Sequence, residues 1–90
     1  MSSLVYMNLQ DTDYTHSIVG AIVQDNPHAE IQRQPSMIRI EAEGRLDIRR
    51  DTVEQLTGSH WDIQEMLMYV ITLGGNVVEE DDSFSLHWSN

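Results

Sequence analysis

No cysteine occurs among the ninety residues of this chain, so neither disulfides nor thiolate-bound metals can hold its fold together. A chain of this length buries only about 60 to 65% of its unfolded surface and cannot support two separate cores. Its hydrophobic fraction of 40% is spread along the whole sequence, which argues against disorder. We therefore expect one domain over residues 1–90, stabilised by the packing of a single small core.

The charge of the chain limits its partners. Fifteen acidic residues stand against five arginines and no lysine, for a net charge of -10. Such a surface repels phosphate backbones and anionic lipids, so we expect neither nucleic acid nor a membrane as partner. A protein partner or a cation is favoured, although acidity also simply keeps a small protein in solution. No leader peptide or membrane-spanning stretch is evident, which predicts a cytoplasmic location.

The first half of the chain alternates strand and helix patterns. Residues 4–9 indicate a short strand that is apolar on both faces. The segment 11–13 supplies an N-cap for a helix, whose apolar residues recur at helical spacing until Asn26 and Pro27 end it. Residues 29–34 alternate weakly, and a clearer strand follows over 37–41.

Matching apolar faces predict a hairpin between residues 37–41 and 45–49. Its loop is the three-residue segment 42–44, which ends in Gly44, where a left-handed residue is wanted. The register gives four charged side chains a structural role as two cross-strand ion pairs. The predicted pairs are Ile40 with Leu46, Ile38 with Ile48, Glu41 with Arg45, and Arg39 with Asp47.

The second half adds short helices and further strands. Arg50 or Asp51 begins a helix that Gly58 ends, and residues 61–65 can add a helical turn. A strand over 66–73 and a C-terminal hairpin around the acidic run 79–82 follow. The fold class is therefore α+β: two strand-helix-strand-strand halves, with short helices packed on small antiparallel sheets.

The strand predicted over 66–73 is apolar on both faces. Such a strand is either central between two layers or carries spare apolar surface. If Tyr69, Ile71 and Leu73 lie partly exposed beside Gly74 and Gly75, they form an aromatic and aliphatic patch of the kind that anchors protein interfaces.

Patterns that carry chemistry are missing from the sequence. The four histidines fall one per segment, without the paired spacing of a helical zinc or di-iron site. The acidic run 79–82 offers oxygen ligands but lacks the spacing and glycine of a calcium loop, so a solvated hairpin turn is the simpler interpretation. We predict no catalytic, cofactor-binding or metal-binding residues.

An ordered set of segments along almost the whole chain resembles one known family. These segments are 1–6, 25–27, 37–42 with Gly44, 48–54 and 75–77. They are similar to the small regulatory component of multicomponent phenol hydroxylases, in the coupling or effector protein family that also serves the soluble methane and toluene monooxygenases. No single motif is chemically diagnostic, but the ordered set of matching segments argues against a chance resemblance.

The resemblance implies a cofactor-free protein that binds an oligomeric di-iron hydroxylase, while a reductase of the same system delivers electrons from NADH. It implies no catalysis by the chain itself; the effector couples oxygen activation and NADH use to substrate hydroxylation. In relatives, the segment matching 69–76 lies at the hydroxylase surface and carries small polar residues. Thr72 keeps this character, whereas Tyr69 stands where asparagine is usual and Gly74 where close relatives carry a small polar residue. The expected partner-binding residues are Tyr69, Ile71, Thr72, Leu73, Gly74 and Asn76.

Two other functions are compatible with the residues alone. One is an acidic protein-binding or inhibitor module for an unrelated basic enzyme, which the charge of -10 favours. The other is a metal-dependent enzyme that uses the acidic run 79–82 and a histidine. Affinity capture separates the first from the effector hypothesis, and elemental analysis decides the second.

Overall fold

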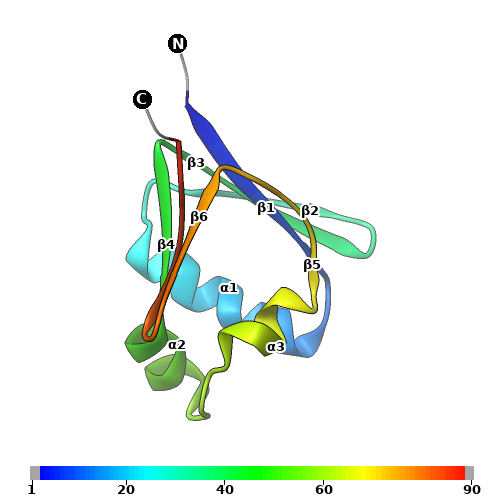
Figure 1. Ribbon diagram of the computed structural model, residues 1–90. Helices are drawn as coiled ribbons and strands as arrows, with labels where there is room; N and C mark the ends of the chain where they lie inside the picture. Colours follow the sequence, from blue (N-terminus) through cyan, green and yellow to red (C-terminus); the bar gives the residue numbers. More distant parts are fainter. Residues whose placement is uncertain (1–2, 89–90) are drawn as a thin grey trace.

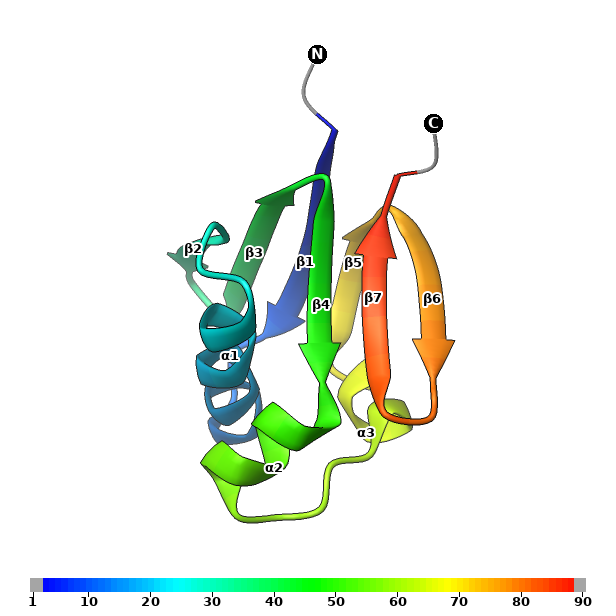
Figure 2. The same cartoon turned by 90° about the vertical axis from the view of Figure 1, so that its left-hand side faces the viewer.

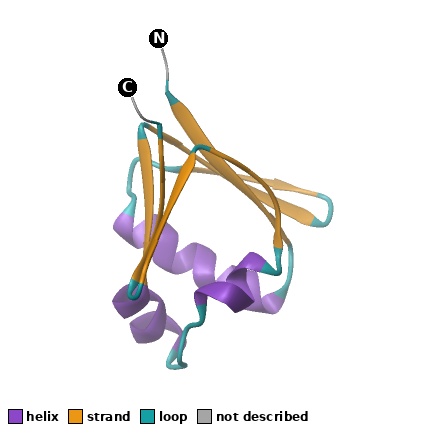
Figure 3. Ribbon diagram, viewed as in Figure 1, coloured by secondary structure: helices purple, strands orange, loops and turns teal. Residues whose placement is uncertain are grey.

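The computed structural model describes residues 3–88, which form two antiparallel sheets and three helices (Figures 1 and 3). The strands are β1 (Leu4–Gln10), β2 (Glu30–Gln34), β3 (Met37–Glu43), β4 (Arg45–Arg49), β5 (Val70–Gly74), β6 (Asn76–Glu80) and β7 (Ser83–His87). The helices are α1 (Asp13–Asp25), α2 (Arg50–Thr57) and α3 (Ile63–Leu67). The predicted α+β class, with short helices on two small antiparallel sheets, is confirmed.

The two sheets draw on both halves of the chain. Their strand orders are β2-β3-β1-β5 and β4-β7-β6 (Figure 2). Strand β5 follows the second and third helices in sequence but pairs with β1, so it ties the second half of the chain to the first sheet. All three helices lie on the same side of the four-stranded sheet, and its other face carries no helix (Figure 1).

One core lies between the sheets and helices. In β1 the side chains of Val5, Met7 and Leu9 are fully buried, and they alternate with Tyr6 and Asn8 on the outer face. Apolar side chains from the other elements complete the cluster: Ile18, Val19, Ala21, Ile22, Ile38, Ile40, Ala42, Leu46, Ile48, Val53, Trp61, Ile63, Met66, Phe84 and Leu86. Tyr6 and Asn8 therefore lie on the outer face of this sheet, where Asn8 is only 8% exposed.

The predicted helix boundaries are confirmed where capping chemistry is present. Thr12 caps α1: its side chain accepts from the Thr15 backbone, and the Thr15 hydroxyl accepts from the Thr12 backbone. Asn26 ends the helix. Helix α2 ends at Gly58, which adopts the left-handed conformation (φ 71°) that the prediction required.

The predicted hairpin between β3 and β4 is wrong. Strand β3 pairs with β1 on one side and β2 on the other, so neither of its edges is open to β4, which pairs with β7. The chain crosses between sheets at Gly44, whose N–H donates to the Ser3 carbonyl at 2.8 Å.

The predicted cross-strand ion pairs are replaced by ion pairs within single strands. Arg39 pairs with Glu41 and Arg45 with Asp47, each at 2.8 Å and two residues apart on one face. The charges were therefore correctly given structural roles, but with the wrong partners. The turn signal and the matching apolar faces favoured the hairpin, whereas β1 and β2 occupy both edges of β3 and β7 pairs with β4.

The strand predicted over 66–73 is shorter than expected. Asp62 caps α3 by accepting from the Gln64 backbone at 2.9 Å, which places Met66 and Leu67 in the helix. Met66 is buried and Met68 is 77% exposed. The apolar residues on both faces thus belong to two different elements: a helix that buries Met66, and strand β5, which begins at Val70.

The C-terminal hairpin of β6 and β7 is confirmed, with Val77 facing Leu86 and Glu79 facing Phe84. Its turn is tighter than predicted, because Glu79 and Glu80 belong to β6 and only Asp81 and Asp82 connect the strands. None of the helices described within residues 3–88 is long and apolar enough to cross a membrane.

Candidate docking surface

Strand β5 is one of the two edge strands of the four-stranded sheet, and it carries most of the predicted partner-binding residues. Within residues 3–88 it pairs only with β1. The pairing joins Asn8 to Thr72 and then Leu9 to Val70, so Ile71 is the extra residue of a β-bulge. Ile71 is 49% exposed. An edge strand with a bulged, exposed isoleucine presents apolar surface without leaving the sheet.

The predicted residues divide into exposed and supporting positions. Ile71, Thr72 and Asn76 are exposed, whereas Tyr69 and Leu73 are half-buried and Gly74 is buried. Leu73 pairs with Met7 and packs against the core. The structure therefore brings three of the six residues to the surface, and the other three lie behind or beside them.

Tyr69 packs against another tyrosine. Its ring lies 4.9 Å from that of Tyr14 between centroids, with the planes tilted by 32°. Burial, followed by the negative charge of Glu65, raises the pKa of Tyr14 to about 12. Both effects disfavour the phenolate form of Tyr14, and its ring supports Tyr69 next to the start of β5 in the chain.

Gly74 lies directly beneath the ring of Tyr6. A Cβ atom at this position would come within 2.1 Å of Tyr6 Cε1, so any other residue displaces the ring. The ring in turn carries the Arg39 guanidinium, 4.2 Å from its centroid. Gly74 is thus needed for the Tyr6 and Arg39 stack on the outer face of the sheet.

Some exposed apolar residues near β5 and a polar residue of β1 were not identified from the sequence. Met68 is 77% exposed and Val77 47% exposed, on either side of β5 in the chain. Asn8 donates to the Thr72 hydroxyl at 2.7 Å. The available signal was the single polar side chain of Asn8 in an otherwise apolar segment.

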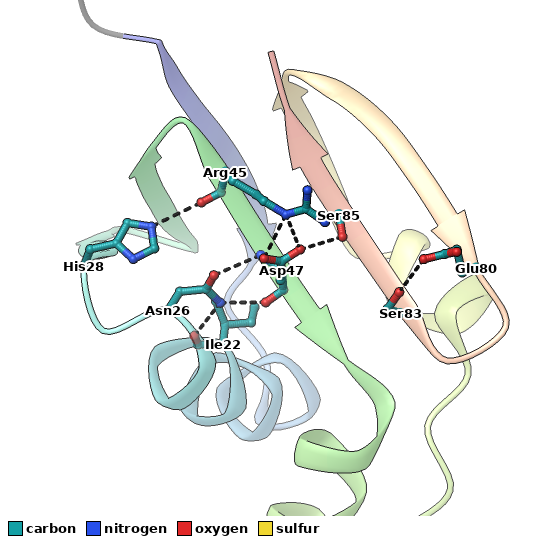
Figure 4. Close-up of polar contacts among 8 residues, drawn as sticks. All are labelled: Ile22, Asn26, His28, Arg45, Asp47, Glu80, Ser83 and Ser85. Carbon is teal, nitrogen blue, oxygen red and sulfur yellow. Dashed lines mark hydrogen bonds and ion pairs between the residues drawn. The ribbon is translucent and has the colours of Figure 1, made fainter. Parts of the chain in front are cut away.

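A polar cluster lies on the three-stranded sheet of β4, β7 and β6, on the face that points away from the core. It forms a groove of about 390 Å³ lined by Asp25, Arg45, Asp47, Arg49, Asp51, Asp82, Ser83 and Ser85. At its centre, the Asp47 carboxylate accepts from Arg45 and, at 2.7 Å, from Ser85 (Figure 4). The buried Asn26 accepts from the Asp47 backbone N–H and donates to its carbonyl, which fixes the end of α1 to β4. The hydrogen bonds that join Asp47 to Arg45, Ser85 and Asn26 give the centre of this groove a structural role.

The histidines are dispersed in the fold as they are in the sequence. His16 pairs with Asp11 and His60 with Glu54, the latter at 3.1 Å. Within the part of the chain that the structure describes, no three histidine, aspartate or glutamate side chains are grouped to hold a metal ion. Of the acidic run, Glu79 accepts from Gln64 and Glu80 from Ser83.

Comparison with known proteins places this fold. A model of the MmoB/DmpM family matches residues 3–87. The chain belongs to the MmoB/DmpM family. Within this family, the stimulatory component DmpM of phenol 2-monooxygenase from Pseudomonas sp. (strain CF600) is 62% identical over 90 residues, which is the full length of both proteins.

Solved structures related to the MmoB/DmpM family share the fold. A chain in the phenol hydroxylase-regulatory protein complex superposes with a TM-score of 0.90 at 51% identity, covering 96% of this chain and 99% of that chain. The soluble methane monooxygenase regulatory protein B superposes with a TM-score of 0.76 at 18% identity, covering 99% of this chain and 67% of that chain. At that identity the second likeness concerns the fold alone.

Proposed function

We propose that this chain is the regulatory component of a phenol hydroxylase and acts by binding the hydroxylase. The observation that carries the proposal is the 62% identity, over the full length of both chains, to a stimulatory component of phenol 2-monooxygenase. The fold match to a chain in a phenol hydroxylase-regulatory protein complex supports it. The chain is then a non-catalytic component that alters the activity of its partner.

The finer part of the proposal concerns what binding does. The partner is an oligomeric di-iron hydroxylase that receives electrons from a reductase of the same system. The regulatory chain favours the hydroxylase conformation in which oxygen activation and NADH use are coupled to substrate hydroxylation. A conformational preference of about 1 to 3 kcal/mol shifts such an equilibrium about 5- to 150-fold. A chain without cofactor can therefore control a reaction whose iron lies elsewhere.

The docking surface of this proposal is built on β5 and the start of β6. Ile71 supplies the apolar contact and Thr72 and Asn76 supply polar ones, since these three side chains are exposed. The remaining positions hold the surface in shape through the core, the tyrosine pair and the Tyr6 ring. The proposed docking residues are Tyr69, Ile71, Thr72, Leu73, Gly74 and Asn76.

Titration of the purified hydroxylase component from the same organism tests the proposal. We expect saturable binding with a defined stoichiometry. Calorimetry, or the fluorescence anisotropy of a label placed on the hydroxylase, measures this binding. Bovine serum albumin, which is also acidic, serves as the control for nonspecific charge effects. Absence of binding to the hydroxylase, together with capture of an unrelated basic enzyme from the native cell, contradicts the proposal and favours an acidic inhibitor module.

A further inference from the structure

The outer face of the four-stranded sheet carries a row of polar side chains that ends at the proposed docking strand. Strand register places Gln32 opposite Arg39, Arg39 opposite Asn8, and Asn8 opposite Thr72. We call these four residues the Thr72 row. Because side chains directly opposite one another on a face are neighbours, the row is a continuous line across all four strands.

Hydrogen bonds fix the orientation of the Asn8 amide within the row. Its Nδ2 donates to Thr72 Oγ1 at 2.7 Å, and its Oδ1 accepts from Arg39 Nη1 at 3.5 Å. A guanidinium can only donate, so the Asn8 oxygen must face Arg39 and the Asn8 amino group must face Thr72. Asn8 is only 8% exposed, which restricts the amide to this arrangement.

Arg39 is itself held in place by the Glu41 carboxylate and by the Tyr6 ring. Its Nε donates to Glu41 at 2.8 Å, and its guanidinium stacks over the Tyr6 ring. Gln32 donates to the other oxygen of Glu41 at 3.1 Å. The cation that orients Asn8 therefore has little freedom to move away.

We propose that Asn8 and Arg39 are positioning residues that make the Thr72 hydroxyl a hydrogen-bond donor toward the hydroxylase. Thr72 Oγ1 accepts from Asn8, and among residues 3–88 Asn8 is the only side-chain partner of this hydroxyl. The hydroxyl hydrogen is therefore left to point outward from an exposed residue on an edge strand. The matching atom on the hydroxylase is an oxygen acceptor, a carbonyl or a carboxylate. The inference rests on the proposed function.

The isosteric change Asn8→Asp reverses the polarity of this contact. An aspartate at this place pairs with Arg39 and accepts a hydrogen bond from Thr72, so it takes up the hydrogen that the hydroxylase acceptor needs. We expect binding to phenol hydroxylase to weaken about 3- to 10-fold, the range of one lost hydrogen bond. The fold is retained, because the Arg39 partner is now an anion.

A double-mutant cycle of Asn8→Asp with Thr72→Val shows whether Asn8→Asp acts through the Thr72 hydroxyl or through its added charge. Thr72→Val removes the donor and is expected to weaken binding by a similar factor, whereas Thr72→Ser retains it. In the Thr72→Val background, Asn8→Asp should have no further effect. Gln10→Glu is the matched control for charge, because Gln10 is exposed, lies on the same face of β1 and makes no side-chain hydrogen bond within residues 3–88; we expect its dissociation constant to stay within twofold of wild type.

Two results overturn the inference. One is a dissociation constant for Asn8→Asp or Thr72→Val within twofold of wild type. The other is an equal loss from Asn8→Asp with and without the Thr72 hydroxyl, which assigns the effect to charge. If Asn8→Asp fails to fold, Arg39→Gln replaces it in the cycle, since it releases the amide orientation at a partly exposed site. If the wild-type protein binds the hydroxylase and either result is found, only this inference is rejected. If the wild-type protein does not bind the hydroxylase, the proposed function is rejected.

Discussion

Replacement of Ile71 by aspartate is expected to weaken binding to phenol hydroxylase by tenfold or more while leaving the fold intact. The side chain is 49% exposed, and the residue stands at a β-bulge where it has no partner in β1. Loss of an apolar contact and burial of a charge in the interface act in the same direction, and tenfold corresponds to about 1.4 kcal/mol. Titration calorimetry measures the loss, and circular dichroism checks the fold.

Leu56→Asp is the matched control for this variant. Leu56 is 51% exposed on α2, outside the proposed docking surface, so its substitution introduces the same charge at a similarly exposed apolar residue. We expect its affinity for the hydroxylase to stay within twofold of wild type. Equal losses from Leu56→Asp and Ile71→Asp would mean that β5 has no special part in docking.

Leu73→Asp is expected to lower the free energy of unfolding of the free protein by about 3 kcal/mol. Ile71→Asp, only two residues away, is expected to leave the fold intact. Leu73 lies opposite Met7 and packs against the buried core, so aspartate there loses apolar burial and places a charge at the core edge. For a domain of this size the change lowers Tm by roughly 10 °C or more. Urea or thermal unfolding measures it without any partner.

The conservative variant Leu73→Met shows whether packing is the cause. Methionine keeps the volume and apolar character, so its cost should stay below about 1.5 kcal/mol. The sequence placed Ile71 and Leu73 in one apolar patch, and the bulge in β5 is the reason to expect different effects from Ile71→Asp and Leu73→Asp. A Leu73→Asp protein as stable as wild type would show that this side chain faces solvent.

Local chemistry made part of the fold predictable from the sequence. Helix α1 was anticipated from its apolar spacing, Thr12 and the Asn26 stop, and the left-handed Gly58 marked the end of α2. The C-terminal hairpin followed from alternation between Phe84, Leu86 and their polar neighbours. These features depend on residues a few positions apart, which a single sequence displays.

Long-range competition made other parts unpredictable. The pairing of β3 with β4 satisfied apolar register and charge, but β1 and β2 occupy both edges of β3. Residues 66–73 looked like one apolar strand, whereas the Asp62 cap turns the first two of them into helix. Apolar patterns indicate which residues are buried, but they do not indicate which of several strands pair with one another.

The residues of the proposed docking surface were named from the sequence, but the sequence did not distinguish the exposed residues among them from the buried ones. The segment around β5 was identified, yet the exposed Ile71 could not be told from the inward Leu73, because a β-bulge shifts the alternation between them. The contribution of Asn8 was also beyond reach, since it is 64 residues from Thr72 and adjacent only through the sheet. Such contacts become visible when strand register is known.

The central claim is that this chain supplies a docking surface and no chemistry of its own. A reconstituted assay with hydroxylase, reductase, NADH and phenol tests it most directly, by comparing product formed with NADH consumed as the chain is added. The account predicts more hydroxylated product and less NADH oxidised per product, with no reaction from the chain alone. Unchanged turnover and unchanged coupling in the presence of saturating chain would contradict it.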